Sequence, residues 1–191
     1  MKRAVLLILP ALLCWATGCV MTPAQVARFG PPPNHAKSPN FDARTTWRTA
    51  VLPPAAVQDA DAAPTDGLYD YAAMALMRTG RFTVVDRSAV DRLLAEQEFS
   101  YSGAADPASA ARLGKMLGAE AVMLVSVNSV RHDEFFSNSP EYREARLHIK
   151  VISVETTEVL YSAQGEASSF EGAAGALEGA LEAALAGVNR S

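Results

Sequence analysis

Cysteine is nearly absent from this sequence: only Cys14 and Cys19 occur, and both lie close to the N-terminus. A disulfide framework, which small exported domains use to compensate for a small core, therefore has no residues to build it after position 19. The stability of the remaining chain has to come from the packing of apolar side chains, which form 49% of the sequence.

Positive charge is also in short supply, with 17 Lys and Arg residues against 21 Asp and Glu residues. If an N-terminal signal removes Lys2 and Arg3, 15 basic residues face 21 acidic ones and the formal charge changes from -4 to -6. An acidic surface repels phosphate backbones, so the composition argues against nucleic acid as a partner.

The usual catalytic signatures are missing as well. The sequence contains no G-x-S-x-G, no H-E-x-x-H and no phosphate-binding glycine loop. Of its three histidines, only His132 and His148 fall within the predicted domain and could act as bases. A metal site at His132, Asp133 and Glu134 is not expected, because adjacent residues cannot all face one ion. The sequence therefore predicts a protein that is not an enzyme and holds no cofactor and no metal.

The first residues have the pattern of an export signal. Lys2 and Arg3 precede an apolar run over residues 4–16, which is too short to span a bilayer. The segment Ala16-Thr17-Gly18-Cys19 resembles a bacterial lipobox, so we expect residues 1–18 to be a lipoprotein signal peptide and Cys19 to be lipidated. Because Ala16 replaces the usual leucine, cleavage by an ordinary signal peptidase is the alternative. Val20 is not the aspartate that retains such proteins at the inner membrane, which favours the outer membrane and its periplasmic face.

A proline-rich segment separates this signal from the rest of the chain. Pro23, Pro39 and the run at residues 31–33 fall in a stretch with no sustained hydrophobic period. We therefore expect residues 19–45 to be the lipidated cysteine and a tether, and residues 46–191 to form one globular domain.

The domain reads as alternating strands and helices. Strands are expected over residues 47–52, 82–85, 122–127, 146–154 and 159–165, the last two as a hairpin, and helices over residues 67–78, after Ser88, after Asp106 and over residues 170–188. This order predicts an α/β fold: a three-layer αβα sandwich around a small mixed sheet that includes an antiparallel hairpin.

Local signals mark the ends of the central helices. Ser88 with Asp91 reads as a weak capping box, while Asp106 with Pro107 is a strong N-terminal signal and Gly118 a C-terminal one. The first of these helices carries an apolar stripe at Val90, Leu93, Leu94 and Gln97, typical of a helix that docks on a core.

Three runs resemble the CsgG-like group of bacterial outer-membrane lipoproteins: VVDRSAVDRLLAEQEFSYSG at residues 84–103, AARLGKMLGAEAVMLVSV at residues 110–127 and LHIKVISVETTEVLYS at residues 147–162. Thr157 stands where that family usually has glycine. The resemblance covers about residues 46–168, and it implies the same α/β fold. Family members that form secretion pores carry two additional membrane hairpins, and residues 128–144 are too short and too charged to be one.

Two groups of residues are candidate partner-binding positions. Phe135 and Phe136 lie in a charged loop and would be contact residues if exposed, although the favoured interpretation is that they fold back onto the domain. Arg146, His148 and Lys150 alternate with apolar residues, so they share one face of a strand. That basic ladder could receive an acidic partner or an anionic glycan, although the favoured interpretation is that it is the hydrated face of the sheet.

The resemblance implies a non-catalytic lipoprotein that binds an envelope protein as an accessory of a curli-like secretion or assembly system. The alternative is an LpoB-like activator of a peptidoglycan synthase, because that group also has a long tether, a compact domain and no pore hairpins. An envelope hydrolase is the less favoured third hypothesis. A homo-oligomer is compatible with each of them.

We expect Cys19→Ser to release the domain from membranes without unfolding it, because the anchor and the core use different parts of the chain. Membrane fractionation with circular dichroism of the released protein measures both effects. Continued membrane association of the variant would contradict the lipid anchor.

Overall fold

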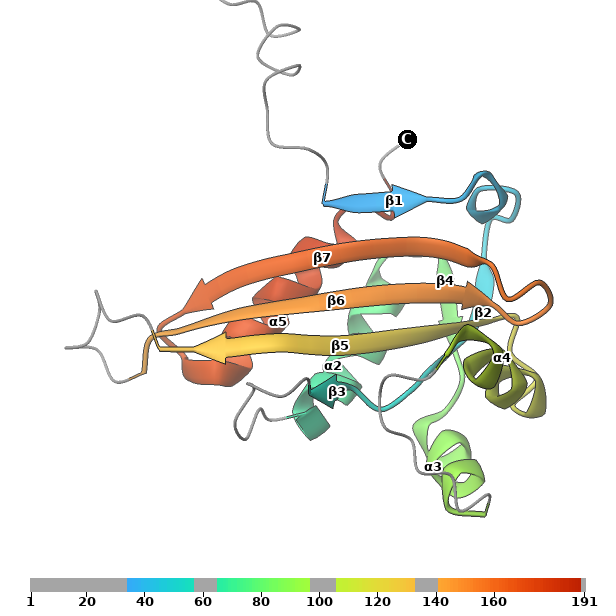
Figure 1. The fold of residues 1–191 in the computed structure, drawn as a ribbon, viewed down its shortest axis with the longest axis horizontal. Coiled ribbons are helices and arrows are strands. Elements are labelled where there is room, and N and C mark those ends of the chain that lie inside the picture. Colours follow the sequence, from blue (N-terminus) through green and yellow to red (C-terminus); the bar gives the residue numbers. More distant parts are fainter. Residues whose placement is uncertain (1–33, 57–64, 97–105, 133–140, 190–191) are drawn as a thin grey trace, which may run out of the picture. The chain divides into compact units, whose positions relative to one another are not determined.

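The computed structural model describes residues 34–56, 65–96, 106–132 and 141–189. In these ranges the chain forms a mixed seven-stranded sheet with helices on both faces (Figure 1). The predicted three-layer αβα sandwich with a mixed sheet is confirmed. No helix in the described ranges combines the length and the apolar character needed to cross a membrane.

The strands follow the spatial order β1-β7-β6-β5-β2-β4, and β3 pairs with β5 beside this path. The bounds are β1 His35–Lys37, β2 Trp47–Val51, β3 Ala55–Ala56, β4 Phe82–Val84, β5 Ala121–Arg131, β6 Arg143–Ser153 and β7 Val159–Ser169. Strand β2 runs parallel to β4 and β5, whereas β5, β6, β7 and β1 are joined by antiparallel pairings. The predicted hairpin is thus the β6–β7 pair, with longer strands than expected.

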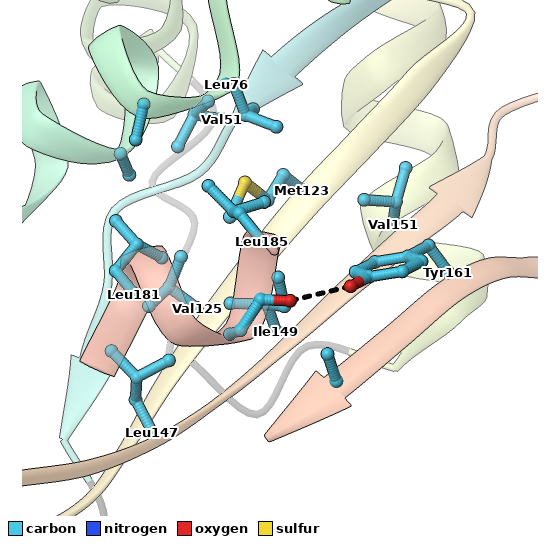
Figure 2. Packing of buried hydrophobic residues seen from close by; sticks show 14 of the residues in the cluster. Val51, Leu76, Met123, Val125, Leu147, Ile149, Val151, Tyr161, Leu181 and Leu185 are labelled. Atoms are coloured by element: carbon cyan, nitrogen blue, oxygen red, sulfur yellow. Dashed lines mark hydrogen bonds between the residues drawn. The ribbon is translucent and has the colours of Figure 1, made fainter. Parts of the chain in front are cut away.

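The helices are α2 Thr65–Arg78, α3 Arg87–Glu96, α4 Pro107–Met116 and α5 Gly172–Leu185, with a 3-10 turn, η1, over Pro39–Phe41. On one face of the sheet, α2 and α5 bury a continuous apolar core against β5, β6 and β7 (Figure 2). Its members include Met123, Val125, Leu147, Ile149, Val151, Leu181 and Leu185. Tyr161 belongs to the same core and donates its hydroxyl to the carbonyl of Ala184 at 2.6 Å, so its one polar atom is satisfied.

On the other face, the described helices cover the sheet only near the end where β2 and β4 lie. A smaller core there joins α3 and α4 to β2, β5 and β6 through Ala50, Leu52, Val90, Leu113, Val122, Leu124 and Ile152. The apolar residues of β6 that face the first core alternate with the polar residues of the opposite face until Ile152, which enters the second core.

Helix α5 lies unusually close to β7. A Cβ atom built on Gly165 would come within 1.7 Å of the carbonyl oxygen of Ala180, so only glycine fits at this crossing. Ala180, Leu181 and Ala184 are fully buried on the inner side of the helix. The small side chains of Ala180 and Ala184, together with Gly165 on β7, therefore let the helix pack closely on the sheet.

The predicted end signals of α4 are confirmed, whereas the predicted N-cap of α3 is wrong. Asp106 caps α4 by accepting from the backbone N–H groups of Ala108 and Ser109, and Gly118 ends it with a φ of 63°. Ser88 is not the cap of α3: its N–H donates to the carboxylate of Asp86 at 2.9 Å, so the cap lies two residues earlier.

Some apolar side chains that the helical spacing predicts to be buried are partly or largely exposed in the structure. In α3 only Val90 is buried, while Leu93 and Leu94 are half-buried because the helix rests on the rim of the second core. Met116, which the spacing assigns to the inner stripe of α4, is 54% exposed.

The folded part of the chain begins earlier than the predicted boundary at residue 46. Strand β1 pairs with β7, and Phe41 of η1 is fully buried. Ser38 and Asn40 donate hydrogen bonds to the carboxylate of Glu158, which lower its pKa. Residues 34–45 therefore belong to the domain, because they form the edge of its sheet. The predicted tether before them, with Cys19, lies outside the described residues.

The turn between β6 and β7 contains the one described non-glycine residue with a positive φ, Thr157 at 59°. Its hydroxyl donates to the carbonyl of Thr156 at 2.6 Å. A β-branched residue is strained in this left-handed region, and this is the position at which the resembled family usually has glycine.

We expect Thr157→Gly to raise the free energy of unfolding by about 0.5–1 kcal/mol. Relief of the left-handed backbone is worth about 1–2 kcal/mol, and the added freedom of glycine in the unfolded chain returns about 0.5–1 kcal/mol. Chemical denaturation measures the difference. Thr156→Gly is the control, because Thr156 has no positive φ and its replacement should destabilise. Equal destabilisation by both variants would contradict the strain.

Candidate functional site

The part of the sheet that none of the described helices covers carries a set of polar side chains, which we call the polar face. On β6, Arg146 and Lys150 are exposed and His148 is half-buried, while Leu147, Ile149 and Val151 between them are buried on the opposite side. The three residues predicted from the alternation therefore do share one face of one strand. Strand β7 completes the polar face with Ser162, Gln164 and Glu166.

The register of the antiparallel strands brings these side chains together. Arg146 is opposite Glu166, and its Nη2 lies 2.8 Å from the Glu166 Oε1 atom. His148 is opposite Gln164 and contacts Ser162 diagonally, with 2.9 Å between Nε2 and Oγ. Such cross-strand pairs order the surface but stabilise an exposed sheet only modestly.

The charges of the polar face do not cancel. Burial, together with repulsion from Lys150, lowers the pKa of His148, so its imidazole is neutral at neutral pH. The hydrogen bond from Arg146 to Glu166 raises the pKa of Arg146 and joins the two opposite charges. Lys150 lies opposite Leu124 and Ser162, which are neutral. At neutral pH the polar face therefore has one excess positive charge, at Lys150.

A polar hollow of about 550 Å³ opens beside Arg146. The register of β5 shifts between Val127 and Ser129, and this irregularity turns Asn128 and Ser129 toward the hollow. Its other polar walls come from Asn34, Arg131, Gln164 and Glu166. The hollow is therefore formed jointly by β5, β6, β7, the residue before β1 and Ala183 of α5.

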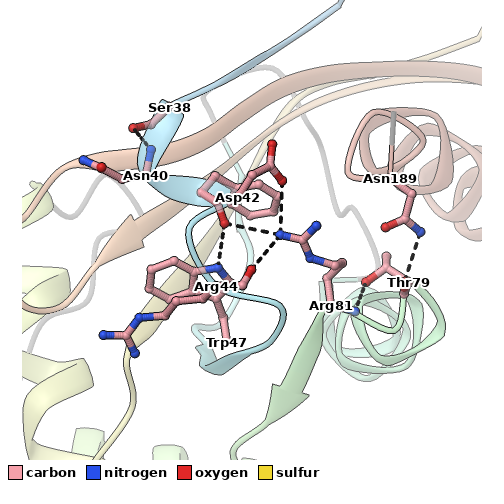
Figure 3. A network of polar contacts seen from close by, with 9 residues as sticks. Ser38, Asn40, Asp42, Arg44, Trp47, Thr79, Arg81 and Asn189 are labelled. Carbon is pink, nitrogen blue, oxygen red and sulfur yellow. Dashed lines mark hydrogen bonds and ion pairs between the residues drawn. The ribbon is translucent and has the colours of Figure 1, made fainter. Parts of the chain in front are cut away.

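A second hollow, of about 530 Å³, lies near the β6–β7 turn and is lined by Arg44, Trp47, Lys115, Glu120 and Glu155 among others. Figure 3 shows the hydrogen bonds that fix the segment with Arg44 in the wall of this hollow. The Arg81 guanidinium donates to the carbonyls of Phe41 and Arg44 and to the carboxylate of Asp42. Arg44 and Glu120 form an ion pair within the hollow. Positive and negative side chains are mixed here, so the hollow has no clear preference for a charged ligand.

Other predicted positions are not brought to the polar face. His132 follows β5 and is exposed. Asp133, Glu134, Phe135 and Phe136 lie outside the described residues. Within the described ranges, no group of three or more His, Cys, Asp or Glu side chains could hold a metal ion.

Sequence reasoning missed the contribution of β7 and of β5. Ser162, Gln164 and Glu166 alternate with buried Tyr161, Ala163 and Gly165, so the same period that identified β6 was available. The irregularity at Asn128 leaves no such signal, because a bulge depends on the partner strand rather than on a local pattern.

A family model described as curli production assembly/transport component CsgG matches residues 43–190, which is most of the chain. A comparison with curated protein sequences gives no match.

Solved structures share the fold at low sequence identity. The PelC dodecamer from Paraburkholderia phytofirmans is similar with a TM-score of 0.53 and 14% identity, covering 82% of this chain and 96% of that one. The NMR structure of E. coli LpoB has a TM-score of 0.51 and 14% identity over 88% of this chain and 83% of that one. Lipoprotein GNA1162 from Neisseria meningitidis has a TM-score of 0.50 and 14% identity, with coverages of 64% and 82%. At such identity these likenesses establish the fold alone.

The lowered pKa of His148 predicts a pH dependence of stability. The folded chain disfavours the charged imidazole, so the unfolded chain binds more protons once the pH falls below the ordinary histidine value of about 6.5. We expect the free energy of unfolding to fall between about pH 7.5 and pH 5.5, by less than about 1 kcal/mol because the site is partly hydrated, and His148→Gln to remove this portion.

Chemical denaturation at both pH values gives the free energy of unfolding of the variant and of the original chain. Subtracting one from the other removes the contribution of the other histidines, which is the same in both chains. Lys150→Gln is the matched control: an NMR titration should show the pKa of His148 moving up toward its ordinary value. An unchanged pH dependence in His148→Gln would contradict the prediction.

Proposed function

The chain belongs to the CsgG family, and on this premise we propose that it is a non-catalytic lipoprotein of the outer membrane, facing the periplasm, that binds a protein partner of the cell envelope. The observation that carries the proposal is the polar face. One side of β6 is buried under α2 and α5, while Arg146, His148 and Lys150 on the other side are left to solvent or to a partner.

The chemistry of the polar face suits recognition. Arg146 and Glu166 hold each other in a fixed orientation, and Ser162 does the same for His148. Lys150 then offers a positive charge on a rigid strand, without an acidic residue opposite it on either neighbouring strand. A partner surface with a carboxylate opposite Lys150 would be attracted, and this attraction would steer its approach.

The proposed anchor is Cys19, and the residues between it and Asn34 would let the domain work away from the membrane. A fully extended proline-rich segment advances about 3.1 Å per residue, so this stretch would reach several tens of ångströms. The partner is therefore expected in the periplasmic space or in the cell wall rather than within the membrane.

We propose an accessory role in a curli-like secretion or assembly system as the first candidate, following the family to which the chain belongs. Activation of a peptidoglycan synthase is the second candidate, on the resemblance of the sequence to the LpoB-like group. The two differ in what in-cell crosslinking of the full, membrane-anchored chain should capture: secretion components for the first, penicillin-binding proteins for the second.

We expect Lys150→Glu to reduce the amount of the crosslinked partner by about tenfold, which corresponds to about 1.4 kcal/mol and is typical for a reversed charge at an interface. Quantitative mass spectrometry of the crosslinked material measures the change. Arg92→Glu is the control, because it makes the same change in net charge on an exposed position of α3. Equal capture by both variants would contradict a role for the polar face.

The enzyme hypothesis is tested separately on the purified chain. His148 and Ser162 are close enough for proton transfer, so among the described residues this pair is the candidate base and nucleophile of a hydrolase. Hydrolysis of envelope material that is lost in His148→Ala would overturn the non-catalytic proposal. Sedimentation of the same preparation tests the proposed homo-oligomer.

A further inference from the structure

Strand β7 is paired along only part of its outer edge. Strand β1 contacts it at Tyr161, Ser162 and Ala163. The ladder ends at the next residue, where the Gln164 N–H donates to the Asn34 carbonyl at 2.8 Å. Within the described residues no strand pairs with residues 165–169 on this side, and Figure 1 shows β7 extending well beyond β1 toward its arrowhead. We call residues 165–169 on this side the open edge.

The open edge presents backbone groups in the geometry of a β-ladder. The N–H of Gln164 points toward β1, and alternate residues of a strand point their backbone groups the same way. The N–H and C=O groups of Glu166 and Ser168 therefore face outward. A row of outward N–H and C=O groups is the template to which an extended peptide adds as a further strand.

The chain's own sequence does not supply that strand. Continued in the same register, position 32 would lie opposite Glu166, and Pro31, Pro32 and Pro33 precede Asn34. Proline has no N–H to donate and cannot continue the ladder at that position. The residues that precede β1 are therefore unsuited to occupy the open edge in this register, which favours an occupant from another polypeptide.

Helix α5, which packs beside the open edge, indicates which side chains an added strand could carry on that side. Gly187, just after α5, receives the ring of His35 from β1: a Cβ atom on Gly187 would lie 2.4 Å from that ring. Ala183 and Gly179 stand four and eight residues earlier, and both are partly exposed whereas Gly187 is buried. A Cβ atom on Gly179 would already lie 3.0 Å from the Cβ atom of Ala167 on β7, whereas Ala183 lines the polar hollow, so of the two Ala183 faces open space. Four helical residues rise about 6 Å and two strand residues about 6.7 Å, so the spacing between Gly187 and Ala183 matches that of alternate side chains on a strand. We call the space in front of Ala183 the notch.

The polar hollow beside Arg146 adjoins the open edge, and its wall includes Gly165 of β7 and Ala183 of α5. Arg131, Arg146, Glu166 and Gln164 line it, so two guanidinium groups and one carboxylate form its wall, while Glu144 lies opposite Arg131 on β6 and is not part of the lining. An added strand would place its second set of side chains over this hollow. A small side chain toward α5 and an acidic one toward the arginines therefore fit the two sides.

We propose that the open edge of β7 binds an extended segment of a partner protein by β-strand addition, with a small side chain against Ala183 and an acidic side chain over Arg131 and Arg146. This deepens the proposed function, on which it rests, because it names the form in which the partner is recognised. It is a backbone interaction, distinct from the contact expected at Lys150.

The test follows amide hydrogen exchange in the full chain, resolved to single residues by mass spectrometry with electron-transfer fragmentation. The probe is a synthetic peptide in which alanine alternates with threonine and one aspartate. In the free chain, the amides of Glu166 and Ser168 should exchange rapidly and that of Gln164 slowly. The peptide should slow Glu166 and Ser168 by about tenfold, the factor expected from one hydrogen bond of ordinary strength.

Ala183→Leu fills the notch and should abolish the slowing, whereas Ala174→Leu, on an exposed side of the same helix, should leave it unchanged. The inference is overturned if the peptide does not slow these amides, if both variants respond alike, or if the amides are already protected in the free chain. Protection that grows with protein concentration would identify a second copy as the occupant instead.

The two proposals fail separately. If Ala183→Leu keeps full crosslinking to the partner while Lys150→Glu loses it, the polar face binds the partner and strand addition is wrong. If neither variant affects crosslinking, the binding role of this side of the sheet is wrong as a whole.

Discussion

The crossing of α5 over β7 at Gly165 is the contact on which the rest of the domain depends. Because no side chain separates the two backbones there, the helix lies deep enough for Leu177, Leu181 and Ala184 to be fully buried on the sheet. Tyr161 then reaches the last turn of the helix and closes the core beside β1. A larger residue at position 165 would lift the helix and open the core along its length.

The lengths of the elements decide which surface is left for recognition. Strands β5, β6 and β7 each have 11 residues and so extend about 36 Å. Helices α3 and α4 on the second face have 10 residues each, or about 15 Å, and they sit together near β2. Short helices on long strands leave part of that face uncovered, and this part carries Arg146, His148 and Lys150. The polar face is therefore a consequence of architecture as much as of composition.

Local signals were reliable where the physics is local. Asp106 and Pro107 start α4 and Gly118 ends it, because capping and a left-handed residue involve only near neighbours in sequence. The alternation of β6 was equally readable, since the period of a strand appears in its own residues. Ser88 and Leu93 were misread because the choice between two neighbouring caps, and the depth at which a helix docks, depend on what the helix meets in space. Residues 34–45 resembled a linker for the same reason, since β1 is a strand only through its pairing with β7.

By itself the sequence determined the layered α/β class, the strand β6 whose polar residues form the candidate site, and the β6–β7 hairpin to which this strand belongs. These features depend on the hydrophobic period and on turn-forming residues, and both can be recognised in consecutive residues. Only the tertiary structure decided that Glu166 contacts Arg146 and that Ser162 contacts His148. It also decided that a hollow opens beside a shift in register and that β7 extends beyond its pairing with β1. Those features arise from the register between strands and from the distance between a helix and a sheet. Both quantities are fixed by contacts between residues far apart in the chain, which no local pattern records.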